Sequence, residues 1–168
     1  HGAPTEGNAH PHFVEGVAVV HNGIIENFSE LKDELIAVGA TFTTQTDTEV
    51  VAQLVAKYRR EGLGRREAMH AMLRRVTGAY ALAVIFEDDP STIMAARSGP
   101  PLAIGHGRGE MFLGSDAIAL APFTNEISYL VDGDWAVIGR DGAHLFDIGG
   151  NRVERAKQIS SAAAYLTD

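Results

Sequence analysis

The sequence predicts an α+β domain built from layers of helices and antiparallel sheets. Helical patterns that follow short apolar strands occupy the chain up to residue 78, and a long series of short strands comes after them. Helices followed by such a β-meander are typical of layered α+β folds. A doubly wound nucleotide-binding fold is disfavoured, because the strands come in hairpins and do not alternate with helices.

The first strand is expected at residues 17–20, after a loop-like segment over residues 1–12. Its run of valine and alanine lacks polar alternation and predicts a strand buried on both faces. His21, Asn22 and Gly23 should stand where this strand ends. An amide side chain and an unhindered backbone N–H at that point suit an oxyanion hole, but Asn-Gly is also a common turn dipeptide. Taken alone, the pattern favours the turn.

The first helix is expected to begin at Asn27, whose side chain should cap it while Glu30 closes a capping box, and to end at Gly39. Residues 41–44 predict a short strand, and residues 46–49 a second capped helix start. The remaining predicted elements are a helix at about 65–76, strands at 79–86, 92–96, 102–105, 111–113, 127–131, 136–139 and 144–148, and a short helix at 117–121.

The composition is that of one globular domain with a sizeable core: 168 residues, 45% hydrophobic and 21% charged. The net charge is −8 and the arginine pairs are spread along two predicted helices, which argues against nucleic-acid binding. No run is long enough to span a membrane, and the polar start is not a signal peptide. The absence of cysteine excludes disulfides, thiolate metal sites and a cysteine nucleophile within these residues, and it fits a cytoplasmic protein.

Four motifs occur together in a characteristic order: NAHPH at residues 8–12, HNG at 21–23, TDTEV at 46–50 and RSGPPL at 97–102. Further agreement comes from residues 78–80, 114–116 and 133–134. From residue 1 to about residue 158 the chain resembles the glutaminase domain of the class II glutamine amidotransferases. Within that family it is most similar to the members that convert fructose 6-phosphate to glucosamine 6-phosphate. The tripeptide HNG alone would be a weak signal, but the ordered set is specific.

The resemblance implies an N-terminal nucleophile hydrolase fold, a four-layer α/β/β/α sandwich with two antiparallel sheets. In that family an N-terminal cysteine attacks the side-chain amide of L-glutamine, and its own α-amine serves as the base, so one residue carries both groups. The reaction passes through a tetrahedral oxyanion and a thioester and releases ammonia. A sugar-isomerase domain receives the ammonia, and further copies of the protein are expected as partners in a homo-oligomer.

By the same resemblance, Asn22 and Gly23 match the oxyanion hole, and Gly23 also contacts the substrate. Asp47 matches the carboxylate that receives the α-ammonium group of glutamine. The alternative for Asp47 is an acid in the first turn of a helix, where the helix dipole favours a negative charge. The residues alone leave these two interpretations open.

His1 matches a histidine of the loop that closes over bound glutamine, and His10 and His21 match histidines beside the site. We interpret His10 and His21 as hydrogen-bonded structural residues. The pair His10 and His12 has no carboxylate or thiolate company, so we expect no metal, and no cofactor is implied. The sequence does not decide whether Arg97 is structural or faces a partner.

The chain departs from the family pattern in two ways. It holds no cysteine, and it lacks the arginine that the family places just before the residue matched by His1 to bind the α-carboxylate. We therefore expect a glutaminase domain without its first strands over residues 1–158, followed by the start of a linker over residues 159–168. Such a chain should not hydrolyse glutamine alone, and its uncovered sheet should favour self-association.

Two other hypotheses stay open. The same domain occurs in other class II enzymes, such as the phosphoribosylpyrophosphate amidotransferase of purine synthesis, although residues 24–26 and 96–99 favour the first assignment. The other hypothesis is a glutamine-binding module without enzyme activity, which keeps the pocket and has lost the nucleophile.

Overall fold

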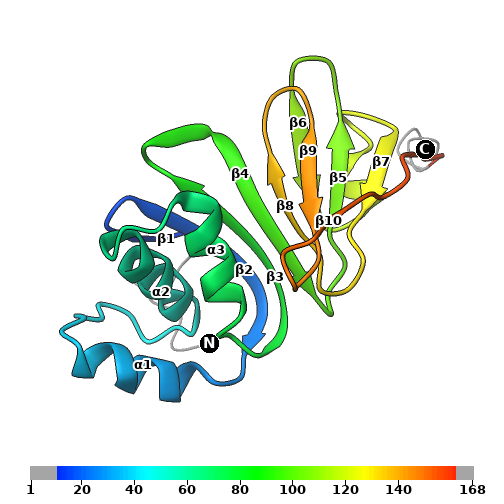
Figure 1. The fold of residues 1–168 in the computed structure, drawn as a ribbon. Helices are drawn as coiled ribbons and strands as arrows, with labels where there is room; N and C mark the ends of the chain where they lie inside the picture. Colours follow the sequence, from blue (N-terminus) through cyan, green and yellow to red (C-terminus); the bar gives the residue numbers. More distant parts are fainter. Residues whose placement is uncertain (1–10, 162–168) are drawn as a thin grey trace.

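The computed structural model describes residues 11–161 of the chain (Figure 1). Its helices are α1 (Phe28–Ala37), α2 (Thr48–Arg60), α3 (Arg65–Leu73) and the short α4 (Ala117–Leu120). Its strands are β1 (His12–Val14), β2 (Val17–Ile25), β3 (Gly78–Phe86), β4 (Asp89–Ser98), β5 (Ala103–His106), β6 (Met111–Gly114), β7 (Glu126–Tyr129), β8 (Trp135–Ile138), β9 (Ala143–Phe146), β10 (Arg152–Val153) and β11 (Gln158–Ile159). Among residues 11–161, no helix has the length and apolar character needed to cross a membrane.

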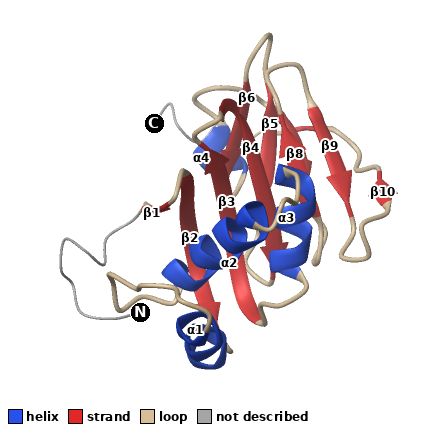
Figure 2. Ribbon diagram, turned by 60° about the vertical axis from the view of Figure 1, so that its left-hand side comes forward, coloured by secondary structure: helices blue, strands red, loops and turns tan. Residues whose placement is uncertain are grey.

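Two antiparallel sheets form the centre of the fold, with the strand orders β1-β2-β3-β4-β8-β9-β10 and β11-β7-β5-β6. Helices α1, α2 and α3 cover one face of the larger sheet, and the smaller sheet stands beyond the other face (Figures 1 and 2). Along β5, Ile104 packs with Ala95 and Ala136 of the larger sheet, while Ala103 packs with Leu120 of α4. The layers therefore follow the predicted order of helix, sheet, sheet and helix, and the α+β prediction is confirmed.

Strand β2 is longer and less enclosed than the sequence predicts. It spans Val17–Ile25 and pairs with β3 along its whole length. Val19 is fully buried under the helices, whereas Val20 is 50% and Ile24 53% exposed. The prediction of burial on both faces is wrong for the described residues, because the apolar contacts of the smaller sheet are with β3, β4, β8 and β9. The placement of residues 21–23 after the strand is also wrong, since all three lie within β2.

The capping box predicted for the first helix does not form. Asn27 precedes α1, but its side chain makes no cap hydrogen bond. Its Oδ1 accepts the N–H of Thr77 at 3.0 Å, and its Nδ2 donates to the carbonyl of Arg75 at 2.8 Å. Asn27 therefore connects the start of α1 to the segment that leads into β3, and local sequence gives no sign of that distant partner.

The strand predicted at residues 41–44 is a loop in the structure. The backbone amides of Thr43 and Thr44 donate to the carboxylate of Glu49, so they do not join a sheet ladder. The other predicted helices and strands are present, with ends that shift by a few residues.

Helix α2 provides much of the contact between the helix layer and the larger sheet. Its residues 48–56 are all buried. It shares one apolar core with residues of β2, β3 and β4, among them Val19, Leu82, Val84 and Met94. Burial of this apolar surface is the main force that fixes the first turn of α2 against β2.

Arg97, near the end of β4, connects that strand to the segment between the two sheets. Its Nη1 donates to the carbonyl of Leu130 at 2.6 Å, and its Nε and Nη2 donate to the carbonyl of Gly99 at 3.2 and 3.1 Å. Its backbone pairs with Gly133 and Asp134. These contacts give Arg97 a structural role, which the sequence left open.

We expect Arg97→Lys to lower the free energy of unfolding by about 1–2 kcal/mol, because an ammonium group cannot satisfy both carbonyls with the geometry of a guanidinium. Denaturant unfolding followed by circular dichroism measures the change. Arg74→Lys is the matched control at an exposed position and should change stability by less than about 0.5 kcal/mol. An equal loss in the two variants would contradict the role assigned to Arg97.

Candidate functional site

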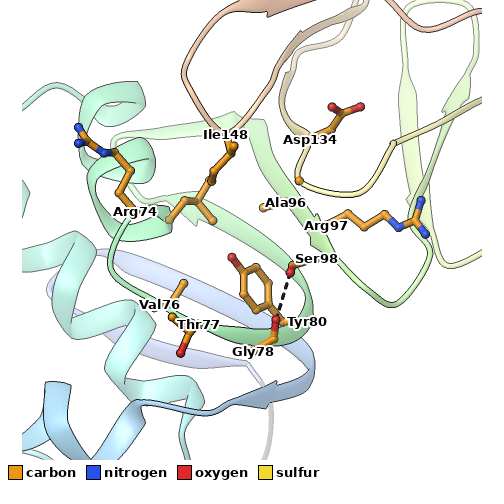
Figure 3. Close-up of a pocket in the computed structure, with 12 residues that line it drawn as sticks. Arg74, Val76, Thr77, Gly78, Tyr80, Ala96, Arg97, Ser98, Asp134 and Ile148 are labelled. Atoms are coloured by element: carbon orange, nitrogen blue, oxygen red, sulfur yellow. Dashed lines mark hydrogen bonds between the residues drawn. The ribbon is translucent and has the colours of Figure 1, made fainter.

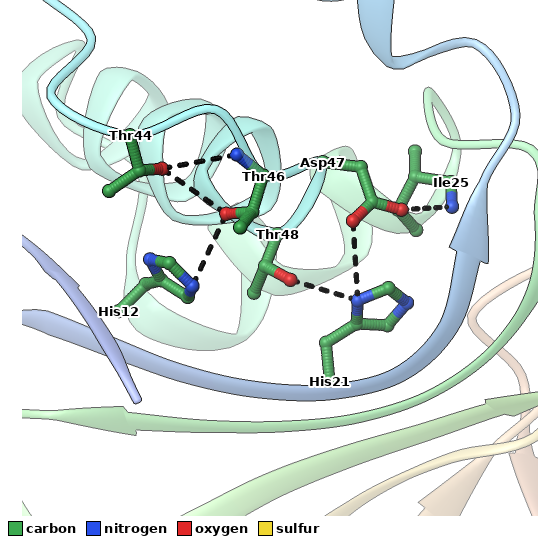
Figure 4. Close-up of polar contacts among 7 residues, drawn as sticks. All are labelled: His12, His21, Ile25, Thr44, Thr46, Asp47 and Thr48. Carbon is green, nitrogen blue, oxygen red and sulfur yellow. Dashed lines mark hydrogen bonds and ion pairs between the residues drawn. The ribbon is translucent and has the colours of Figure 1, made fainter. Parts of the chain in front are cut away.

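The start of α2 meets the end of β2 through the side chain of Asp47 (Figure 4). Its Oδ2 accepts the N–H of Ile25 at 2.7 Å, and its Oδ1 lies 3.8 Å from Nδ1 of His21. The same Nδ1 lies 2.9 Å from Oγ1 of Thr48. Asp47 is 3% and His21 6% exposed. The structure thus brings together two residues that the sequence singled out and adds Thr48 as a third.

Asp47 occupies the residue before α2, but its side chain makes no cap hydrogen bond to that helix. The carboxylate instead holds the amide of Ile25 in the neighbouring strand. A hydrogen bond to an ionised acceptor is stronger than a neutral one, and the helix dipole also favours negative charge here. The arrangement places one buried carboxylate beside residues 23–25 of β2. A negative charge in that position suits the binding of a cationic group.

Asn22 and Gly23 follow His21 along β2 but present different groups. Because side chains alternate along a strand, Asn22 points to the face opposite His21, where it is exposed. Gly23 has φ +115°, and a Cβ at this position would lie 2.0 Å from the carbonyl oxygen of Ala79 on β3. Glycine is therefore required here. An amide side chain and the backbone of a glycine stand next to each other on the open face of β2.

Gly78 lies opposite this segment, paired with Ile25. It has φ +137°, and its missing Cβ would lie 2.1 Å from the carbonyl oxygen of Ile24. Ser98 donates from Oγ to the carbonyl of Gly78 at 3.1 Å (Figure 3). Sequence comparison includes Gly78 only as part of the family pattern. Its steric role depends on Ile24, which is 54 residues away in the chain, so local sequence patterns do not reveal it.

A cavity of about 420 Å³ lies on the other side of β3 from β2, with Tyr80 in its wall (Figure 3). Burial and the negative charge of Asp132 raise the pKa of Tyr80, so its phenol stays neutral. Asn22, Gly23 and Asp47 do not line this cavity. The cavity therefore borders the candidate site without containing it.

The loop that leads into α2 is held by polar side chains that sequence reasoning missed. Glu49 is 1% exposed, and its carboxylate accepts the amides of Thr43 and Thr44. Thr46 Oγ1 lies 3.2 Å from Nε2 of His12, which belongs to β1. The motif at residues 46–50 correctly predicts a helix start, but nothing in it shows that Glu49 accepts the amides of the preceding loop.

His1 and His10 lie outside the described residues, so their assignment to the site stays a prediction.

Comparison with known proteins places the chain in one family. Residues 4–122 match the model of the glutamine amidotransferase domain. The chain is 82% identical over 168 residues to the glutamine–fructose-6-phosphate aminotransferase (isomerizing) of Rhizobium meliloti strain 1021, and 73% identical over the same length to that of Agrobacterium fabrum strain C58. Both matches cover 100% of this chain and 28% of the relative. The chain therefore spans little more than a quarter of the length of these relatives.

Solved structures support the same assignment. The glutamine phosphoribosylpyrophosphate amidotransferase of B. subtilis superposes with a TM-score of 0.70 at 27% identity, covering 89% of this chain and 34% of that one. A glutamine aminotransferase class-II domain protein from Silicibacter pomeroyi has a TM-score of 0.59 at 18% identity, covering 84% of this chain and 70% of that one, and it shows the fold alone. Because the family model matches well over half of its residues, the chain belongs to the family of glutamine amidotransferase domains, whose substrate is glutamine.

Proposed function

We propose that this chain supplies the glutamine-binding half of the glutaminase site in a glutamine–fructose-6-phosphate aminotransferase. The observation that carries the proposal is the 82% identity over all 168 residues to the Rhizobium meliloti protein of that name. The parent enzyme releases ammonia from glutamine and uses it to convert fructose 6-phosphate to glucosamine 6-phosphate. Asn22 and Gly23 lie within β2, and Asp47 holds the amide of Ile25 two residues further along the same strand, so all three belong to the end of β2 that the proposal assigns to the first of these steps.

In the proposed mechanism, the side-chain amide of Asn22 and the N–H of Gly23 donate to the oxygen that becomes negative when the substrate amide is attacked. Donors fixed before the reaction stabilise this charge without reorganisation. Asp47 receives the α-ammonium group of glutamine, for which its buried carboxylate provides an opposite charge. His21, and His10 by the family resemblance, support the site, and His1 belongs to the loop over the substrate.

The nucleophile of the proposed reaction is a cysteine from a part of the parent protein outside these 168 residues, which hold no cysteine. The exposed face of β2 supports a nucleophile that comes from another part of the parent protein. Val20 and Ile24 flank Asn22 on that face, and Phe13 of the neighbouring β1 is 72% exposed. Exposed large apolar side chains that lie together on one face mark a surface that another segment or protein covers. A segment seated there would bring a nucleophile to the amide of Asn22.

The other class II enzymes are the second candidate. The phosphoribosylpyrophosphate enzyme matches in fold, but its 27% identity is far below the 82% found for the aminotransferase. A glutamine-binding module without activity would carry the same site residues. The two hypotheses differ only in whether the full-length protein hydrolyses glutamine. The sugar-isomerase domain, the homo-oligomer, the cytoplasmic location and the boundary at residue 158 stay predictions.

Two substitutions in the full-length protein test the roles of Asn22 and Asp47. We expect Asn22→Ala to lower kcat for glutamine hydrolysis by about 100-fold or more with little change in KM, because it removes a donor to the transition state.

Asp47→Asn should mainly raise KM, by about tenfold, because it removes the charge that binds the α-ammonium group. Release of glutamate measures both.

Asp33→Asn, an exposed acid in α1, is the control for both variants and should match the unsubstituted protein. An Asp47→Asn variant with unchanged KM would contradict substrate binding by Asp47. A full-length protein that does not hydrolyse glutamine would favour the binding module.

The 168-residue chain by itself should release no ammonia from glutamine, because none of its side chains can form the thioester. A coupled ammonia assay with purified chain measures this. The full-length protein is the positive control. Turnover by the chain alone at the rate of the full-length protein would overturn the proposal that the nucleophile lies elsewhere.

A further inference from the structure

Glu49 is a buried acid that the proposed reaction does not use. Its side chain is 1% exposed in the first turn of α2, two residues after Asp47. A charged carboxylate removed from water is costly unless hydrogen bonds replace the water. The hydrogen-bond partners of the Glu49 carboxylate therefore determine its role.

Those partners belong to the loop before α2. Oε1 accepts the amide of Thr44 at 2.7 Å, and Oε2 accepts the amide of Thr43 at 3.0 Å and the side chain of Gln53 at 3.2 Å. Gln53 also donates to the carbonyl of Thr41 at 3.0 Å. Burial by itself raises the pKa of Glu49, but a hydrogen bond from the side chain of Thr44 together with the contacts above outweighs it and lowers the pKa below its ordinary value. The carboxylate is thus ionised and fixes three positions of the loop.

The loop continues directly to Asp47. Thr44 Oγ1 lies 3.2 Å from Oγ1 of Thr46 and accepts the amide of Thr46 at 3.4 Å (Figure 4). Thr46 in turn contacts His12 of β1 at 3.2 Å. A chain of hydrogen bonds therefore leads from Glu49 through Thr44 to the residue before Asp47. Figure 4 shows Thr44, Thr46 and Asp47 following one another along this path.

We propose that Glu49 is a positioning residue of the glutamine site, which shapes residues 43–46 so that the carboxylate of Asp47 points at β2 and the α-ammonium group of the substrate. This inference rests on the proposed function. Glu49 does not touch the substrate; it acts through Asp47. Its removal therefore affects glutamine binding more than the chemical step, and only while Asp47 is present.

The test uses a double-mutant cycle in the full-length protein, with KM and kcat for glutamine hydrolysis measured for Glu49→Gln, Asp47→Asn and the double variant. The glutamine side chain introduced at position 49 has nearly the same volume as glutamate. It carries no negative charge, so it binds the two loop amides more weakly. We expect Glu49→Gln to raise KM about tenfold with kcat changed less than about threefold. In the Asp47→Asn background the same substitution should raise KM less than about twofold, because the shared contact is already lost.

Two further variants control the experiment. Glu61→Gln removes an exposed acid after the other end of α2 and should leave KM and kcat unchanged. Thr44→Val keeps the backbone amide that Glu49 binds and removes the hydroxyl, which hydrogen-bonds Glu49 and reaches Thr46. It should raise KM by a smaller factor of about three, and it decides the proposal if Glu49→Gln does not fold.

The outcomes separate this inference from the proposed function. If Asp47→Asn raises KM and Glu49→Gln does not, the role of Glu49 is overturned and the glutamine site stands. Equal effects of Glu49→Gln with and without Asp47, or a loss mainly in kcat, would also overturn it, since both indicate general structural damage. If Asp47→Asn leaves KM unchanged, the binding role of Asp47 and this inference fall together.

Discussion

The hydrogen bond from the amide of Ile25 to the carboxylate of Asp47 is the contact on which the geometry of the site depends. It joins the first turn of α2 to the strand that carries Asn22 and Gly23, and both ends are buried. The apolar face of α2 brings the helix to the sheet, but burial of apolar area has no direction. The hydrogen bond adds direction, because only one register of α2 against β2 places the carboxylate on that amide.

Two glycines make the paired strands possible at this point. Gly23 and Gly78 lie on neighbouring strands with φ of +115° and +137°. At each position a Cβ would clash with a carbonyl oxygen of the other strand. Side chains at either position would push β2 and β3 apart. Regular pairing from Val17 to Asn22 on one side and the Asn27 contacts on the other keep the two strands at this short separation.

The sequence was informative where local pattern determines structure and misleading where distant partners do. The helices over residues 48–60 and 65–73 follow from their apolar periodicity, and the hairpins after residue 78 follow from short strands between turn residues. Asn27 was wrongly predicted to cap a helix because a capping pattern cannot reveal a partner near residue 76. Residues 41–44 resembled a strand because their β propensity was visible and the buried acceptor at Glu49 was not.

For the candidate site, the sequence did not predict the structural setting of the motif at residues 21–23. The continuous apolar run suggested a strand enclosed on both faces, whereas Val20 and Ile24 are exposed. The apolar pattern of residues 17–20 does not by itself distinguish a strand covered on both faces from one whose outer face is about half exposed, as here. The two faces of β2 carry different residues: His21 contacts Asp47 on the side of the helices, and Asn22 lies on the exposed side. Contacts among α2, β2 and β3 alone fix the positions of Asp47 and Gly23, so the groups of the proposed site are oriented by the fold before any substrate binds.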